Sequence, residues 1–303
     1  MAAPEIVADY GDLCGEGPLW NCAEQALYWT DIAGRRFYRC SWPDRRHEIV
    51  HQGFEVAGFA FNASGGFVVV NSSGIWLWDG AAERTLIADT ADGHRCALND
   101  CIADPSGRLF TGSLFWAPDR TDYERGCLFR VETDGSVAVV DEGFGLSNGL
   151  GFSPDNRILY FTDSAERIIY AYDYRQQDGS LRNRRVFVRV PRDQGAPDGL
   201  TVDAEGLVWS AQWFGACVVR YDPDGREERR ISTPAAQTSS VAFGGPELTD
   251  LFITSAAFSD ALPLAPPGYS TENRNIGGQL YHLNAGIPGK PEHLARIAHG
   301  LPR

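Results

Sequence analysis

Short runs of β-branched and aromatic residues, separated by turns rich in Gly, Asp, Asn and Pro, recur along the whole chain. No helical period of 3.6 residues continues over ten or more positions. The clearest repeat is a turn followed by an aromatic-rich strand, and it predicts the same local structure each time. Its copies are AEQALYWTD (23–31), ASGGFVVVN (63–71), PSGRLFTGS (105–113), PDNRILYFTD (154–163), AEGLVWSAQ (204–212) and ELTDLFITS (247–255).

A second strand follows each copy, and a third segment follows after a further turn. The second strands are RFYRC (36–40), IWLWD (75–79), CLFRV (127–131), IIYAYD (168–173), CVVRYD (217–222) and QLYHL (279–283). With a short run before the turn, such as GLGFS, each unit supplies four strands. Six such units predict an all-β fold, a six-bladed β-propeller with four-stranded blades, as one domain over residues 1–303. The regular spacing disfavours a β-sandwich.

Two segments compete to complete the last blade. The N-terminal EIVAD (5–9) resembles the outer strands LIAD and AVVD, and residues 292–297 are the rival. The sequence does not decide between them.

The aligned turns allow equivalent positions on the innermost strands to be located by counting back along the chain. Eight positions before the turn residues Glu24, Gly65, Gly107, Asn156, Gly206 and Leu248 lie Glu16, Ala57, Asn99, Asn148, Asp198 and Ser240. In a propeller these equivalent positions project toward one axis at one depth. We therefore expect the carboxylates and amides among them to converge in the central channel.

Two carboxylates and two amide oxygens at one level form an oxygen-donor cage that suits a hard divalent cation. Glycine stands beside three of the candidates, in Gly15-Glu16-Gly17, Asn148-Gly149 and Asp198-Gly199. A residue without a Cβ permits unusual backbone angles and close approach of a ligand. Asn-Gly and Asp-Gly are also ordinary turn dipeptides. The prediction of a cation site therefore depends on the common spacing of eight residues between each candidate and its turn.

Gly145-Leu146-Ser147-Asn148-Gly149 matches the G-x-S-x-G nucleophile elbow of serine hydrolases. That elbow needs a helix after the serine, whereas LGFSPDNRILYFTD predicts strand, turn and strand. None of the six histidines falls on an inner-strand position. We expect Ser147 to bond local backbone and not to act as a nucleophile.

Charge, cysteine content and the absence of long apolar runs indicate which kinds of partner and location to expect. The formal charge of −13 would repel a phosphate backbone, so no nucleic-acid partner is expected. The seven cysteines include no C-x-x-C pair, which predicts reduced thiols. The N-terminus lacks a basic and apolar leader, and no run of about 18 apolar residues occurs, so we expect a cytoplasmic protein without a membrane partner. A monomer or small homo-oligomer is compatible with all of this.

Four motifs in order resemble the gluconolactonase, regucalcin and senescence-marker-protein family of sugar lactonases over nearly the whole chain. They are GEGPLW (15–20), ALND (97–100) followed by ADPSGRLFTGS, LSNGLGFSPDNRILYFTDS (146–164) and PDGLTVDAEGLVW (197–209). The resemblance implies a propeller with one divalent metal held by Glu16, Asn148 and Asp198. It also implies that Asp198 is the general base and that Asn99 contacts substrate. Ca²⁺ is the first expectation for the metal, with Mg²⁺, Mn²⁺, Zn²⁺ or Fe²⁺ as alternatives.

The substrate pocket departs from the family pattern. Relatives usually carry Arg two residues before Asn99, where this chain has Ala97, and some carry a Glu where it has Ala117. Arg95, Asp119 or Asp122 are candidates to compensate. We expect Asn99, Asp100 and Arg95 to bind substrate, with aromatic walls from Trp116, Trp213 and Phe258; Phe115 and Tyr269 are further aromatic candidates. The Pro-rich segment 256–276 is predicted to be a lid or pocket wall.

The predicted reaction is hydrolysis of a small-molecule aldonolactone to the aldonic acid, with the metal as Lewis acid. Two alternatives keep the same cage. One is a propeller like the calcium-dependent organophosphate hydrolases, and the other is a calcium-binding propeller without catalysis.

Overall fold

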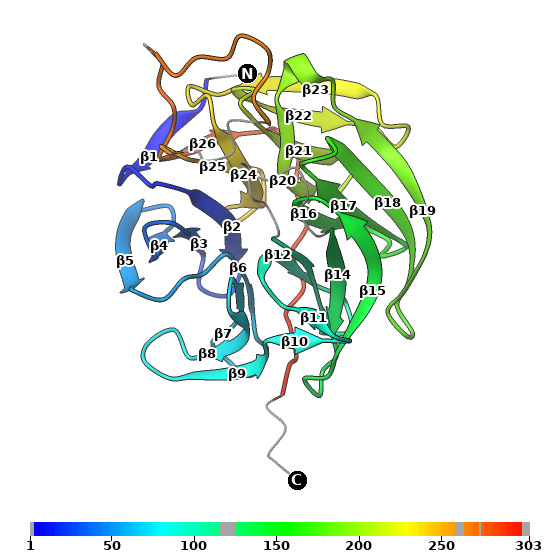
Figure 1. The fold of residues 1–303 in the computed structure, drawn as a ribbon. Helices are drawn as coiled ribbons and strands as arrows, with labels where there is room; N and C mark the ends of the chain where they lie inside the picture. The colour runs from blue at the N-terminus through cyan, green and yellow to red at the C-terminus, as the bar shows by residue number, and fades with distance from the viewer. Residues whose placement is uncertain (1–2, 115–124, 259–263, 273, 299–303) are drawn as a thin grey trace.

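The computed structural model of the chain describes residues 3–114, 125–258, 264–272 and 274–298. Its strands form six four-stranded antiparallel sheets around a common axis, so the predicted six-bladed propeller is confirmed (Figure 1). From the axis outward, the first three blades are β2 (Gly15–Asn21), β3 (Ala26–Asp31), β4 (Arg36–Ser41), β5 (Arg46–Gln52); β6 (Gly58–Phe61), β7 (Phe67–Asn71), β8 (Gly74–Trp78), β9 (Arg84–Ala88); and β12 (Leu98–Ala103), β13 (Leu109–Ser113), β14 (Gly126–Val131), β15 (Val137–Phe144). The last three are β16 (Ser147–Phe152), β17 (Ile158–Asp163), β18 (Ile168–Arg175), β19 (Ser180–Arg189); β20 (Ala196–Val202), β21 (Val208–Trp213), β22 (Cys217–Tyr221), β23 (Glu227–Ser232); and β24 (Thr238–Gly244), β25 (Asp250–Ser255), β26 (Gln279–Asn284), β1 (Glu5–Asp9).

The repeated turn has a physical basis in one residue with left-handed backbone. In five blades this residue stands at the aligned position, as Gly65, Gly107, Asn156, Gly206 and Leu248, with φ between 54° and 99°. Its N–H donates to the carbonyl three residues earlier in every one of these turns, at 2.8–3.0 Å. In the first blade the left-handed residue is Gln25 (φ 49°), one position after the aligned Glu24. Glycine and Asn adopt this conformation at the least cost, which explains why these turns are readable in the sequence.

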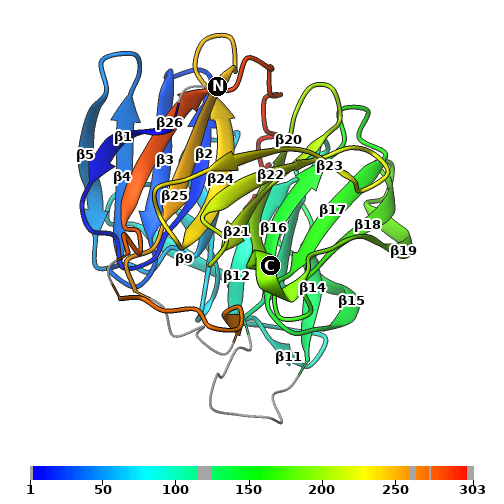
Figure 2. The ribbon, with the colours of Figure 1, turned by 90° about the horizontal axis from the view of Figure 1, so that it is seen from above.

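The N-terminal strand closes the ring. β1 pairs antiparallel with the outer side of β26, so the first residues of the chain complete the last blade. The rival segment 292–297 does not join the last blade, since its Ala295 bridges to Asn62 of the second blade; just before it, Gly289 bridges to Asp203. In Figure 2 this C-terminal segment (red) and the loop after residue 264 (orange) lie on opposite faces of the disc.

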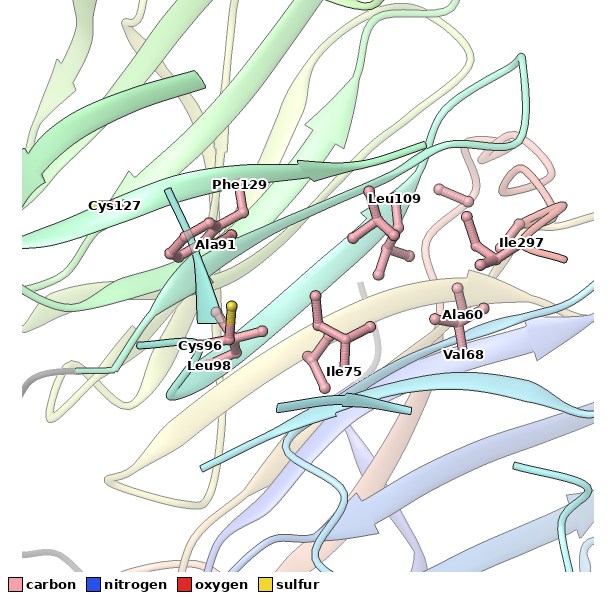
Figure 3. Packing of buried hydrophobic residues seen from close by; sticks show 14 residues of the cluster. Ala60, Val68, Ile75, Ala91, Cys96, Leu98, Leu109, Cys127, Phe129 and Ile297 are labelled. Carbon is pink, nitrogen blue, oxygen red and sulfur yellow. The ribbon is translucent and has the colours of Figure 1, made fainter. Parts of the chain in front are cut away.

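The hydrophobic core is divided among the blade interfaces. Six clusters of buried residues each contain members of two neighbouring blades. Figure 3 shows the cluster between the second and third blades, where Ile75 faces Leu109 and Ile297 of the C-terminal segment completes one end. Because each sheet is covered on both faces by its neighbours, second strands such as β3 and β17 are buried along nearly their whole length, whereas outer strands such as β5 are exposed.

Two short elements were not predicted. A hairpin of β10 (Thr90–Ala91) and β11 (His94–Arg95) stands between the second and third blades, and Arg192–Gln194 forms one 3₁₀ turn. All seven cysteines are described, and no two of them are joined by a disulfide. The prediction of reduced thiols agrees with this arrangement.

Candidate functional site

The innermost strands contain β-bulges near the positions that lie eight residues before the aligned turns. In five blades the innermost strand shifts register against the second strand. The residues that flank each shift on the innermost strand are Glu16/Leu19, Leu98/Cys101, Asn148/Leu150, Pro197/Leu200 and Thr238/Val241. Such bulges break the strict alternation of side chains and re-aim a residue, and they are common beside active sites. Glu16, Asn99, Asn148 and Asp198 lie at or within four of them. The same local device therefore turns four polar side chains toward the axis.

These residues line one pocket of about 260 Å³ at the end of the channel. Six of the predicted site residues belong to its wall: Glu16, Asn99, Asn148, Asp198, Trp213 and Phe258. The remaining wall is made by Cys14, Ile32, Ala33, Leu114, Leu146, Ser164, Ala196 and Leu264. The predicted convergence of four oxygen-bearing side chains is therefore present in the structure.

Hydrogen bonds tie three blades together at the floor of the pocket. Nδ2 of Asn99 donates to Oδ1 of Asn148 at 2.6 Å and to the backbone carbonyl of Ser147 at 2.9 Å. Nδ2 of Asn148 donates to Oγ of Ser164 at 2.8 Å, and that hydroxyl donates to the carbonyl of Pro197 at 2.6 Å. Pro197 directly precedes Asp198. The chain of bonds therefore holds the amide of Asn148 in one orientation, with its oxygen on the side of Asn99.

Two buried aspartates fix the strand entries. Oδ1 of Asp31 accepts from the N–H of Cys14 at 2.9 Å, and Oδ1 of Asp163 accepts from the N–H of Leu146 at 3.1 Å. Each of these aspartates ends the second strand of its blade, in the TD of YWTD and YFTD. Each N–H lies two residues before a cage residue, Glu16 or Asn148. The repeated TD thus anchors the backbone from which two cage side chains project.

Three carboxyl groups meet near the axis and disfavour one another's charge. Burial, followed by the nearby Asp100 carboxylate, raises the pKa of Glu16 to about 8, against a smaller lowering effect of the Gly17 N–H. Burial and the charges of Glu16 and Asp100 raise the pKa of Asp198 well above its ordinary range. Burial also raises the pKa of Asp100 to about 6. The cage by itself is therefore a poor place for negative charge.

The donor set fits a divalent cation. Oδ1 of Asp198 is buried and has no hydrogen-bond partner among the described residues. An orphaned carboxylate oxygen is costly unless a cation or proton satisfies it. Glu16, Asn148 and Asp198 offer only oxygen, as hard cations require. A positive charge at this position would also offset the repulsion between the carboxylates.

Two predicted substrate residues lie elsewhere in the described structure. Asp100 follows Asn99 on β12 and lines a second cavity of about 70 Å³, which Ser240, Lys290 and Glu292 also line. Arg95 is exposed on β11, where its guanidinium donates to the carbonyl of Ser72, and it is not part of the pocket wall. The hairpin carries Arg95 away from the axis, which the sequence spacing did not indicate.

Several loop predictions fall partly outside the described residues. Phe115, Trp116, Ala117, Asp119 and Asp122 belong to the segment 115–124, which the structure does not describe. The described part of segment 256–276 does contribute to the pocket wall, through Phe258 and Leu264.

Ser147 is buried, with 1% of its surface exposed, and it does not line the pocket. The residues after it continue as strand β16 and not as a helix. The expected hydrogen bond from its hydroxyl to local backbone is wrong, because Oγ has no partner among the described residues. The Ser147 side chain instead packs against Gly112. A Cβ on Gly112 would lie only 2.4 Å from Oγ of Ser147.

Sequence reasoning missed Cys14, Ser164 and Leu264 as pocket residues. For Cys14 and Ser164 a signal existed, since Cys14 directly precedes GEGPLW and Ser164 is the last residue of the motif at 146–164. Leu264 was not named individually, although it lies in the segment 256–276 that was predicted to be a lid or pocket wall. Its side chain packs in a cluster with Leu146 and Phe214, which holds this part of the loop against the fourth and fifth blades.

Within the described residues, no helix has both the length and the apolar character needed to cross a membrane.

Residues 14–257 match the family model described as the SMP-30/Gluconolactonase/LRE-like region. Among curated proteins, the chain is 36% identical to pentonolactonase XacC of Haloferax volcanii over 299 residues, covering 97% of this chain and 98% of the relative. It is also 36% identical to 6-deoxy-6-sulfogluconolactonase of Pseudomonas putida over 291 residues, covering 92% and 94%. Among solved structures, regucalcin from Agrobacterium tumefaciens, described as a calcium-binding protein, aligns with a TM-score of 0.83 and 26% identity over 98% of each chain.

Proposed function

Since the chain belongs to the SMP-30/gluconolactonase/LRE-like family, we propose that it is an enzyme that hydrolyses a sugar lactone to the corresponding aldonic acid. Two relatives of 36% identity over more than nine-tenths of the chain are named for lactonase activity on sugar lactones. The observation that carries the proposal is the floor of the pocket, where Glu16, Asn148 and Asp198 present oxygen donors together. The wall around this floor is largely apolar and suits a small ring.

Glu16, Asn148 and Asp198 would hold one divalent cation. Ca²⁺ is our first choice because all three donors are oxygens, and Mg²⁺, Mn²⁺, Zn²⁺ and Fe²⁺ are the alternatives to be compared. When bound, the cation would polarise the lactone carbonyl and offset the negative charge that develops on its oxygen.

Asp198 is the proposed general base. Its carboxyl group lines the pocket, and a bound cation would keep it ionised, so that it could accept a proton from water there. The water oxygen then bonds to the carbonyl carbon, the ring C–O bond breaks, and the proton passes to the ring oxygen as it leaves. Water is consumed and a hydroxy acid forms. A positioned base of this kind typically contributes about 10²- to 10⁴-fold to the rate.

Substrate orientation would come from the pocket wall. Nε1 of Trp213 is buried without a partner among the described residues, so it is a ready donor to a sugar hydroxyl. Phe258, 59% exposed at the rim, offers an aromatic surface to the ring. Asn99 keeps Asn148 in place and lies beside the cage. Asp100 lines the second cavity, so we assign it no direct contact with substrate.

The proposal is tested with purified protein, stripped of metal and reloaded with each cation, against a panel of five- and six-carbon aldonolactones. Asp198→Asn should abolish turnover while circular dichroism and thermal melting show an intact fold. Asp134→Asn, at an exposed turn, is the matched control and should retain full activity. Absence of turnover with every lactone and every metal would end the proposal. Turnover of a phosphotriester without lactone turnover would assign the cage to organophosphate hydrolysis, and metal binding without any turnover would leave a binding protein.

A further inference from the structure

A second set of metal-ligating side chains lies away from the central pocket. The donor atoms of His94, Cys127 and Glu142 all lie within 4.8 Å of one another. None of the three residues lines the central pocket. They come from three strands, β11, β14 and β15, at the junction of the second and third blades.

Backbone pairing holds this group together. Cys127 and Glu142 are partners on the neighbouring strands β14 and β15. The hairpin that carries His94 is anchored to β15, because Oδ2 of Asp92 accepts from the N–H of Val139 at 2.8 Å. Backbone pairing therefore places Cys127 beside Glu142, and the Asp92 hydrogen bond holds the hairpin that carries His94 against the same strand.

The Cys127 side chain also packs in the hydrophobic cluster between the second and third blades, but none of the three donor groups is engaged by a polar partner among the described residues. No Lys or Arg of the described residues forms an ion pair with the Glu142 carboxylate, and neither the His94 ring nor the Cys127 sulfur has a hydrogen-bond partner there. Tetrahedral zinc, with bonds of about 2.0–2.3 Å, separates its ligand atoms by about 3.3–3.8 Å. The three donor atoms lie within 4.8 Å of one another, so rotations of the His94 and Glu142 side chains can bring them to these separations.

We propose that His94, Cys127 and Glu142 form a second metal site, selective for a borderline-soft cation such as Zn²⁺. Imidazole, thiolate and carboxylate are the ligands of zinc in proteins, whereas the central cage offers only oxygen. The two sites therefore prefer different metals. Bound metal would clamp the β10–β11 hairpin to the third blade, and a fourth position would remain for water.

Binding involves loss of one proton. Burial, followed by the Glu142 charge, raises the pKa of the Cys127 thiol to about 11, so the free site holds S–H at neutral pH. The metal binds the thiolate, so the S–H bond breaks, the sulfur electron pair goes to the metal and the proton leaves to solvent. The pKa of the fully buried Cys96 is also raised, by burial first, then by the Asp89 charge and then by Cys127, so Cys96 lies close to the proposed site.

Cobalt(II) is the probe for this site. Metal-stripped protein titrated with Co²⁺ should develop a thiolate-to-cobalt charge-transfer band, Zn²⁺ should bleach it, and about one proton per ion should be released in weak buffer. Cys127→Ser should abolish the band. His94→Gln and Glu142→Gln, which change solvent-accessible side chains and spare the core, should each weaken Co²⁺ affinity by more than the roughly 10- to 100-fold typical of losing an outer-shell partner.

The controls separate this site from the central one. Cys14→Ser changes the cysteine that lines the central pocket, Cys22→Ser changes an exposed cysteine, and Asp198→Asn disables the cage; the band should survive all three. No band in the wild type, a band lost with Cys14→Ser, or a band unchanged in His94→Gln and Glu142→Gln would each overturn the proposal. If Cys127→Ser does not fold, the His94 and Glu142 variants decide alone.

Discussion

Nδ2 of Asn99 donates a 2.6 Å hydrogen bond to Oδ1 of Asn148, and this bond joins the innermost strands of two neighbouring blades. The two residues are 49 positions apart, and each stands at the same offset from its own turn. The bond makes the orientation of one cage residue depend on the next blade.

Replacing Asn99 with Ala should therefore lower kcat/KM for the lactone and weaken metal binding. The substitution removes the donor to Asn148, and a buried polar atom left without a partner costs about 1–3 kcal/mol, equivalent to roughly 5- to 150-fold. Steady-state kinetics and metal titration measure both effects. Asn284→Ala, at an exposed strand end, should leave both unchanged. An Asn99→Ala enzyme with wild-type kinetics and metal affinity would contradict the role assigned to this bond.

The glycine after Asn148 should be intolerant of any side chain. A Cβ on Gly149 would lie 2.3 Å from the backbone nitrogen of Leu200 and 2.7 Å from the carbonyl oxygen of Asp198. Because backbone cannot yield easily, Gly149→Ala should destabilise the fold by at least the 1–3 kcal/mol usual for overpacking and should displace Asp198. Chemical denaturation and metal titration provide the measurements.

Gly151→Ala is the comparison for this prediction. Its Cβ would lie closest to the side-chain ends of Leu200, at 2.7 Å, and Val202, at 2.9 Å, with the nearest backbone atom, in Thr201, at an ordinary 3.9 Å. These methyl groups can move, so a smaller loss of stability and near-normal metal binding are expected. Equal effects of the two substitutions would show that backbone proximity at Gly149 is not what limits the site.

Metal-free protein should lose stability as the pH rises from about 6 to 8. The pKa of Glu16 rises from 4.5 in the unfolded chain to about 8 in the fold, so the folded state binds more protons across this interval. A raised acid pKa contributes stability that is present at low pH and is lost as the pH rises through the folded value. Asp198 shifts in the same direction, and Asp12 and Asp100, raised to about 6, add to the loss of stability mainly at the lower end of this interval.

Thermal melting against pH tests this effect. The decline should be shallower in Glu16→Gln, which cannot ionise, and should largely disappear in wild-type protein saturated with Ca²⁺, because a bound cation favours the ionised carboxylates. A metal-free protein whose stability rises from pH 6 to 8 would exclude the assigned proton uptake.

The C-terminal segment should stabilise the propeller from the side opposite the pocket. Ile297 is 2% exposed in the cluster between the second and third blades, and its N–H and carbonyl both bond the side chain of Asn62. Ile297→Ala should cost about 2–5 kcal/mol of unfolding free energy, the range for such core truncations. Leu294→Ala, at a position 49% exposed, should cost less than about 0.5 kcal/mol. Urea denaturation of both variants gives the comparison, and kcat should remain unchanged in each.

The blade repeat, the turns and the level of the four cage residues could be predicted from the sequence because their causes are local. Strand propensity and left-handed turn residues act over a few neighbours, and the repeat carries the same register into every blade. Counting back from Gly107, Asn156 or Gly206 therefore reached Asn99, Asn148 and Asp198. The bulges themselves were not predicted, although they are what aims these side chains at the axis.

Other features depend on segments that meet only when the ring closes. The choice of β1 over residues 292–297 to complete the last blade, the bridge of Ser164 between Asn148 and Pro197, and the outward course of Arg95 on its hairpin all involve residues without a shared local pattern. Asn99 and Asp100 are neighbours in the sequence but line different cavities, and the packing around the axis decides which cavity each one reaches. The sequence by itself thus determined which residues repeat and at what depth. The tertiary structure decided which of them face one another, because contacts between distant segments are selected by the packing of the closed ring as a whole.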